Sequence, residues 1–193
     1  MAEDAITKYK MLAIGGSAGS LDVILRIVTA LPFVSHLATI IIVHRKNDRE
    51  SILTDLLSSR TKLAVKEIED KEAISGGTIY IAPADYHLLI ENEKMFSLDA
   101  SEKIHHSRPS IDVSFESVAE VFGTTAIGVL LSGANADGAD GLSRIKQADG
   151  FTIVQDPASA DVGYMPQQAL ERMKPDKILN GDDIGDFIKE LLQ

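Results

Sequence analysis

Three side chains of the kinds used in nucleophilic catalysis each follow an apolar run of this sequence. Ser17 lies in a glycine-rich turn after residues 10–14, His44 directly follows the run 38–43, and Asp137 lies in a second glycine-rich turn after residues 126–131. A hydroxyl, an imidazole and a carboxylate are the groups of a triad in which a base takes the proton of a serine and an acid orients the base. Nucleophilic acyl transfer is therefore one candidate chemistry for the ends of these three strands.

The turn around Ser17 matches the nucleophile-elbow pattern G-x-S-x-G, in which a tight strand-to-helix turn exposes a serine hydroxyl. The same composition also suits a phosphate cradle or a plain turn, and the pentapeptide alone does not choose among them. A dinucleotide site is disfavoured, because the spacing is not G-x-G-x-x-G and His44 and Arg45 stand where a ribose-binding acid is expected. A Walker A loop is disfavoured too, since no Gly-Lys-Ser/Thr follows.

The base and the acid each have competitors. Only His44 among the histidines ends an apolar run of the kind that forms a buried parallel strand, although a histidine bonded to backbone would look the same. Asp137 could equally cap the helix that follows it, and Asp140 and Asp156 compete for the carboxylate role. The other histidines are His36, His87, His105 and His106.

The elements that must position these residues alternate between strand and helix. Such alternation predicts a doubly wound α/β domain with a mostly parallel sheet, whose ligands bind at the carboxyl ends of the strands. Two runs without a helix between them, 87–91 and 95–98, predict a small antiparallel hairpin. Strands are expected at 10–14, 38–43, 63–68, 78–82, 126–131, 151–155 and 177–179, and helices near 21–28, 52–57, 111–122, 139–147, 166–173 and 184–192, with Ser20 and Ser110 as N-caps.

Composition excludes several classes of function. The chain has 193 residues, a net charge of −10 and no cysteine, which argues against general nucleic-acid or anionic-lipid binding and rules out thiolate or Cys-zinc chemistry. Its longest strongly apolar run, 37–43, is far shorter than the roughly 20 residues of a membrane span, and the N-terminus does not read as a secretory signal. We expect one cytoplasmic domain over residues 1–193, with no membrane insertion.

Several segments in order resemble the catalytic domain of CheB-type chemotaxis methylesterases. The pattern I-A-P-x-D-x-H ends at His87, R-P-S-[IV]-D-V begins at Arg108, and L-[ST]-G-x-x-x-D-G contains Asp137. This series rarely occurs by chance. The matching segments are residues 13–19, the strand ending at 44, 79–87, 108–113, 128–133, 137–139 and 163–166.

The resemblance implies a three-layer α/β/α fold around a seven-stranded parallel sheet, and hydrolysis of glutamate γ-methyl esters on bacterial chemoreceptors. It puts the nucleophile at Ser17, the base at His44 and the orienting acid at Asp137, with backbone support for the oxyanion at Ala18 and Ala134. It implies no metal and no organic cofactor. Deamidation of receptor glutamine and control by a response regulator or kinase are further expectations. We expect residues 1–193 to hold the catalytic domain alone, without the receiver domain of full-length family members.

Three positions depart from the family pattern. Ala18 replaces a hydroxyl residue, Ala134 stands where methionine is common, and a charged segment follows His44 in place of proline and glycine. Arg45, Lys46 and Arg49 lie in that segment, and we expect them to dock a glutamate-rich receptor bundle, which would otherwise repel an acidic enzyme. The departures keep two alternatives open: a CheB-like binding or scaffold module with weak or no catalysis, and a small-ester hydrolase.

Overall fold

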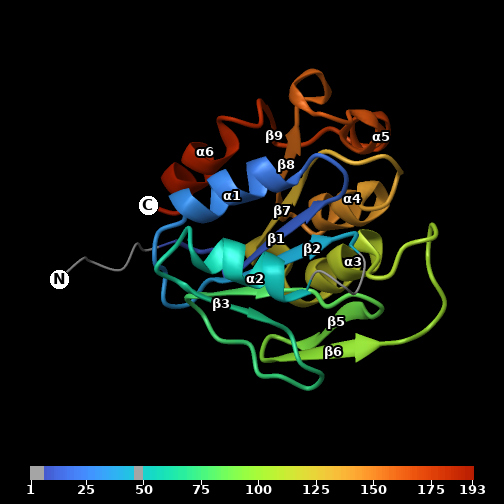
Figure 1. The fold of residues 1–193 in the computed structure, drawn as a ribbon. Coiled ribbons are helices and arrows are strands. Elements are labelled where there is room, and N and C mark those ends of the chain that lie inside the picture. The colour runs from blue at the N-terminus through green and yellow to red at the C-terminus, as the bar shows by residue number, and fades with distance from the viewer. Residues whose placement is uncertain (1–6, 46–49) are drawn as a thin grey trace.

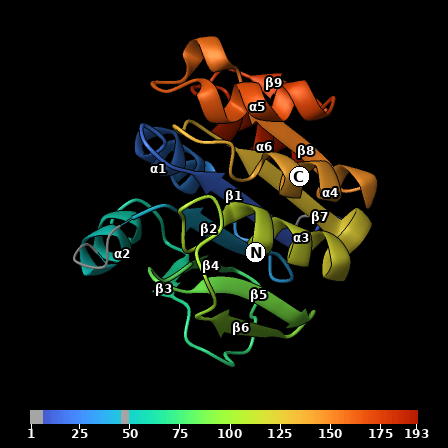
Figure 2. The same cartoon turned by 90° about the vertical axis from the view of Figure 1, so that its right-hand side faces the viewer.

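The structure, a computed structural model, describes residues 7–45 and 50–193. It is built on a seven-stranded sheet whose paired strands are all parallel. Figure 2 shows these strands following one another from β9 near the top to β3 near the bottom. In spatial order they are β3 (Ala64–Glu67), β4 (Thr78–Ile81), β2 (Ala38–Val43), β1 (Met11–Gly16), β7 (Ala126–Leu130), β8 (Phe151–Gln155) and β9 (Lys177–Leu179).

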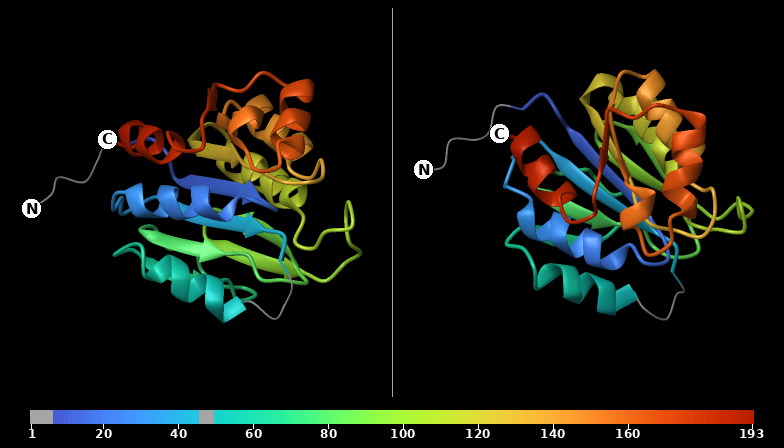
Figure 3. Two further views of the ribbon diagram at one scale, coloured as in Figure 1. Left: turned by 45° about the horizontal axis from the view of Figure 1, so that its top comes forward. Right: turned by 90° about the horizontal axis from the view of Figure 1, so that it is seen from above.

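Helices cover both faces of the sheet and make three layers (Figures 1 and 3). One face carries α1 (Leu21–Ala30), α2 (Glu50–Ser58) and α6 (Ile184–Leu191), and the other carries α3 (Ile111–Phe122), α4 (Ala139–Gln147) and α5 (Tyr164–Arg172). The doubly wound α/β fold expected from the sequence is confirmed.

The central strands are buried on both sides, which explains their continuous apolar runs. Successive side chains of a strand point to opposite faces, so Met11 and Ala13 join the core under α3 and α4, while Leu12 and Ile14 join the core under α1 and α6. All four are fully buried. Among the described residues, no helix is both long and apolar enough to cross a bilayer.

The expected hairpin forms an antiparallel pair of strands, β5 (His87–Asn92) and β6 (Met95–Asp99), outside the main sheet. It is joined to α3 by serine hydroxyls: Ser117 Oγ accepts from Ile90 N at 2.7 Å, and Ser114 Oγ donates to Leu88 O at 3.0 Å. Tyr80 of β4 and Phe96 of β6 meet edge to face, with ring centroids 4.9 Å apart.

Three local expectations need correction. The first strand continues through Gly16 instead of ending at residue 14, because its two glycines still pair with β2. Helix α5 begins at Tyr164, two residues before Pro166, whose missing N–H costs nothing in a first turn. Ser20 is the N-cap of α1, but its hydroxyl donates to Ser17 O instead of accepting from the helix.

Candidate active site

The carboxyl ends of β1 and β2 bring Ser17 and His44 next to each other. Gly16 is paired with Val43, and the His44 N–H donates to Gly16 O at 3.4 Å, so the two following residues lie at adjacent strand ends. On its other side, Ser17 N donates to Ser132 O beyond β7, at 2.9 Å. Strand order reverses between β1 and β7, which is where open parallel sheets bind their ligands.

His44 and Asp137, 93 residues apart, form a short contact across this edge. His44 Nε2 lies 2.7 Å from Asp137 Oδ2. The Asp137 side chain is fully buried and that of His44 is 13% exposed. A carboxylate only accepts, so the proton of the neutral ring lies on Nε2 and the lone pair on Nδ1. Nδ1 is then the nitrogen that can act as a base.

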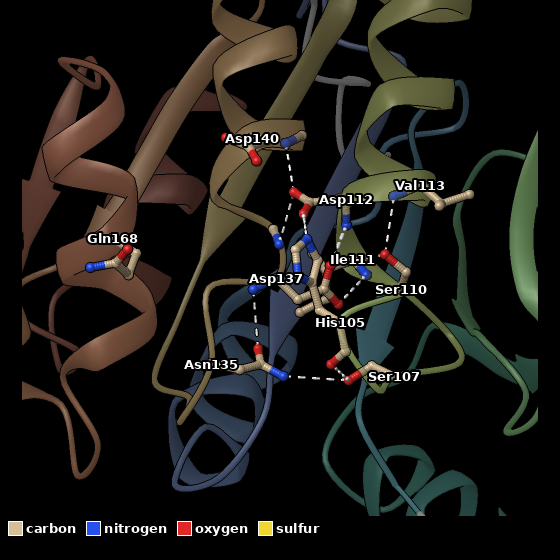
Figure 4. Close-up of polar contacts among 12 residues, drawn as sticks. His105, Ser107, Ser110, Ile111, Asp112, Val113, Asn135, Asp137, Asp140 and Gln168 are labelled. Carbon is tan, nitrogen blue, oxygen red and sulfur yellow. Dashed lines mark hydrogen bonds and ion pairs between the residues drawn. The ribbon is translucent and has the colours of Figure 1, made fainter. Parts of the chain in front are cut away.

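Asp137 does not cap the helix that follows it. The N-cap of α4 is Gly138, and Asp137 turns instead to the start of α3, where Oδ2 accepts from Ile111 N at 2.7 Å. Oδ1 accepts from Ser110 Oγ at 2.9 Å and Asp112 N at 3.0 Å (Figure 4). Burial would raise the pKa of Asp137, but the hydrogen bonds from His44 and from these backbone N–H groups outweigh it and hold the pKa below its usual value.

The competing carboxylates have other partners. Asp140 is exposed and pairs with Arg172 at 2.8 Å, and Asp156 accepts from Ala158 N at 3.0 Å in a short 3₁₀ turn. Of the three candidate acids, only Asp137 contacts His44. Within residues 7–45 and 50–193, no three His, Asp or Glu side chains are grouped so that they could hold a metal ion.

The turn after β1 leaves the Ser17 hydroxyl half-buried and without a hydrogen bond to any other described residue. Gly19 has a φ of +76°, which glycine tolerates and most residues do not. Ala18 and Ala134 are exposed on either side, and their backbone N–H groups donate to nothing within the described chain. Such unpaired N–H groups can stabilise a developing oxyanion.

Arg45 is not a docking residue, because its side chain is only 7% exposed. Its guanidinium pairs with Glu67 Oε2 at 2.6 Å and donates to Ala82 O at 3.2 Å, which ties the end of β2 to β3 and β4. With its side chain turned inward and Nη2 bonded to Glu67, Arg45 does not present its charge at the surface. Lys46 and Arg49 lie outside the described residues.

Sequence reasoning missed four polar residues around the histidine and the acid. Ser110 was expected only as a helix cap, and Asp112, Ser107 and Asn135 were assigned no role. Ser110 and Asp112 are part of the R-P-S-[IV]-D-V motif, and Asn135 lies in the turn that contains Asp137. The motifs therefore point to these segments of the chain. Nothing in the sequence shows that these segments fold against one another.

Comparison with known proteins gives one consistent result. The family model described as CheB methylesterase matches residues 12–188. A putative protein-glutamate methylesterase/protein-glutamine glutaminase of Leptospira interrogans is 39% identical over 185 residues, covering 96% of each chain. A protein of Syntrophus aciditrophicus named protein-glutamate methylesterase/protein-glutamine glutaminase 2 is 33% identical, and this chain spans 55% of its length.

A solved structure is similar as well. The Thermotoga maritima CheB methylesterase catalytic domain superposes with a TM-score of 0.89 at 32% sequence identity, over 95% of this chain and 98% of that one.

Proposed function

The chain belongs to the CheB methylesterase family, and we propose that it hydrolyses γ-methyl esters of glutamate residues in chemoreceptors with Ser17, His44 and Asp137. The observation that carries the proposal is the 2.7 Å contact between His44 Nε2 and the buried Asp137 carboxylate, at the strand end next to Ser17. This contact leaves the lone pair of His44 Nδ1 to serve as base.

In the first step, Ser17 Oγ attacks the γ-carbonyl carbon of the ester while His44 Nδ1 takes its proton. The negative charge of Asp137 stabilises the resulting imidazolium and keeps the ring in the right tautomer. His44 then passes the proton to the methoxy oxygen as the C–O bond breaks. Methanol leaves, and the glutamyl group stays on Ser17 as an ester.

The tetrahedral intermediate carries a negative oxygen that needs donors. We assign the backbone N–H groups of Ala18 and Ala134 to it, because both lie at the edge of the turns beside Ser17 and neither donates within the described chain. A donor of this kind is worth about 3 kcal/mol of barrier.

In the second step, water loses a proton to His44 Nδ1 and attacks the acyl carbon, and His44 returns that proton to Ser17 Oγ. The products are free glutamate and the regenerated serine. The same steps on a glutamine side chain would release ammonia, which supports assigning the glutaminase activity named for the relatives. A cytoplasmic location and control by a response regulator or kinase belong to the same proposal.

The proposal is tested by methanol release from methylated receptor fragments. We expect release by the wild type and a loss of at least about 10³-fold in Ser17→Ala, on the precedent of other serine triads. Ser59→Ala, on an exposed serine just after α2, is the matched control and should keep full activity. No release by the wild type would refute the proposal in favour of a binding module, and release only from small esters would indicate a small-ester hydrolase.

A further inference from the structure

A second hydroxyl lies at the base nitrogen of His44. Ser107 Oγ is 3.5 Å from His44 Nδ1, and Asn135 Nδ2 donates to the same hydroxyl at 3.4 Å. Asn135 Oδ1 in turn accepts from Asp137 N at 3.1 Å. The contacts thus run from one ring nitrogen through Ser107, Asn135 and Asp137 to the other nitrogen, and Figure 4 shows the part from Ser107 to Asp137.

The segment that carries Ser107 is a tight turn between β6 and α3, the yellow-green loop of Figure 1. Ile104 and Ser107 exchange two backbone hydrogen bonds, of 3.1 and 2.8 Å. Between them, His105 and His106 both have positive φ values, 49° and 62°. Two such residues in succession persist only where the surrounding structure determines the turn.

Side chains fix this segment on both flanks. The Arg108 guanidinium donates to Ala100 O at 2.8 Å and to Ser101 O at 2.7 Å. His87 Nε2 bonds Glu102 O at 2.9 Å, and its Nδ1 accepts from Ser110 N at 3.1 Å. These hydrogen bonds fix the loop on both sides of Ser107 and so hold its hydroxyl beside His44 Nδ1.

We propose that Ser107, supported by Asn135, is a positioning residue that aligns the His44 ring so that Nδ1 faces Ser17. This rests on the proposed function. The single lone pair of neutral Nδ1 takes the proton of Ser17, so Ser107 acts by accepting from the Nδ1–H of the imidazolium, while its own hydroxyl proton can be donated to His105 O, 3.5 Å away. The transferred proton moves between Ser17, His44 and the leaving group, and Ser107 keeps its own proton throughout.

The first test is steady-state kinetics of Ser107→Ala. Loss of one hydrogen bond should lower kcat about tenfold with little change in KM and in Tm. Ser107→Thr retains the hydroxyl and should restore most of the rate. The control is Ser101→Ala, whose hydroxyl bonds Asp99 at 2.8 Å in the same segment and which should behave as wild type. An unchanged kcat in Ser107→Ala, or equal losses in the Ala and Thr variants, would overturn the proposal.

The second test uses a fluorophosphonate that labels an activated serine, with the modified peptide identified by mass spectrometry. We expect the label on Ser17, at a rate about tenfold slower in Ser107→Ala and restored in Ser107→Thr. A label on Ser107 would make it the nucleophile and overturn the proposal. This readout does not need a methylated receptor, so a wild type that labels but releases no methanol refutes the proposed substrate without touching the role of Ser107.

Discussion

The Asp137 carboxylate accepts a hydrogen bond at each of four positions, two on each oxygen. One of the four donors is His44, the proposed base, and the other three belong to the start of α3: Ser110 Oγ and the N–H groups of Ile111 and Asp112. The carboxylate proposed to orient His44 is thus itself oriented by a helix N-terminus, whose dipole also favours its negative charge. The proposed chemical role of Asp137 therefore cannot be removed separately from its structural one.

Asp137→Asn should therefore lose both activity and stability. The amide has one accepting oxygen, so its NH₂ must face two donors in a fully buried site, and we expect a loss of about 1–3 kcal/mol in the free energy of unfolding. Turnover should fall about 10⁴-fold, because the tautomer of His44 is no longer imposed. Urea unfolding and methanol release measure the two effects. Asp140→Asn, on the neighbouring exposed carboxylate, is the control, and full turnover in a folded Asp137→Asn protein would refute the triad.

At the scale of elements, α3 and α4 cap each other. Asp137, before α4, accepts from the first N–H groups of α3, while Asp112, in the first turn of α3, accepts from Gly138 N at 2.9 Å and Gly141 N at 2.7 Å. Gly138 has a φ of +94°, and a Cβ there would lie 2.6 Å from Leu130 Cδ1. Each carboxylate thus accepts from N–H groups at the start of the other helix. These hydrogen bonds fix the Asp137 segment against α3, and so fix the Asp137 side chain relative to His44.

The pKa values of Asp112 and Asp137 are shifted in opposite directions, upward for Asp112 and downward for Asp137. Burial raises the pKa of Asp112 to about 6, and the charges of Asp137 and Asp140 add to this against the backbone hydrogen bonds from Gly141 and Gly138. His105 Nε2, 3.7 Å from Asp112 Oδ2, also faces the group. A raised folded-state pKa means that the contribution of Asp112 to stability is fully present below about pH 4 and is lost as the pH rises through 6.

Asp112→Asn should remove this pH dependence. The amide oxygen can still accept from both glycines and carries no charge, so the variant should gain stability relative to wild type between pH 4 and 7, by on the order of 2 kcal/mol. Urea unfolding at pH 4.5 and 7.5 measures the gain. Asp22→Asn, on an exposed carboxylate in the first turn of α1, should show no such trend. A difference between Asp112→Asn and wild type that does not change with pH would contradict the argument.

The whole molecule carries a net charge of −10, and its proposed substrate is also acidic. Encounter is then repulsive unless the face around Ser17 is locally positive. Arg45 cannot supply that charge, because its guanidinium is buried against Glu67. The docking proposal therefore rests on Lys46 and Arg49, which follow His44 in the sequence.

Replacing both Lys46 and Arg49 by Gln should raise KM for receptor fragments several-fold and flatten its dependence on ionic strength. Turnover of a small neutral ester should stay unchanged, because that substrate is not steered by charge. Lys174→Gln with Lys189→Gln changes the net charge equally at exposed sites outside this segment and is the matched control. Equal losses on both substrates would show that the segment supports His44 instead of docking the receptor.

The sequence by itself determined the fold class and the carboxyl-end placement of Ser17, His44 and Asp137. Both follow from local patterns: continuous apolar runs mark strands buried on two faces, and in a parallel sheet every strand delivers its next residue to the same edge. The absence of a helix between 87–91 and 95–98 was enough to predict the antiparallel hairpin. The predicted boundaries are wrong at Gly16 and Tyr164, because glycines can continue a paired strand and a proline fits inside the first turn of a helix.

Only the tertiary structure decided which acid contacts His44, what surrounds the two side chains and that Arg45 is buried. Asp137, Asp140 and Asp156 occupy similar positions after strands, and their different partners depend on the direction each side chain takes in the packed molecule. The contact of Ser107 with His44 joins residues 63 apart, through a turn whose geometry is imposed by its anchors. Charge patterns predict exposure, but burial against Glu67 overrides that for Arg45, because a long-range ion pair leaves no local signal in the sequence.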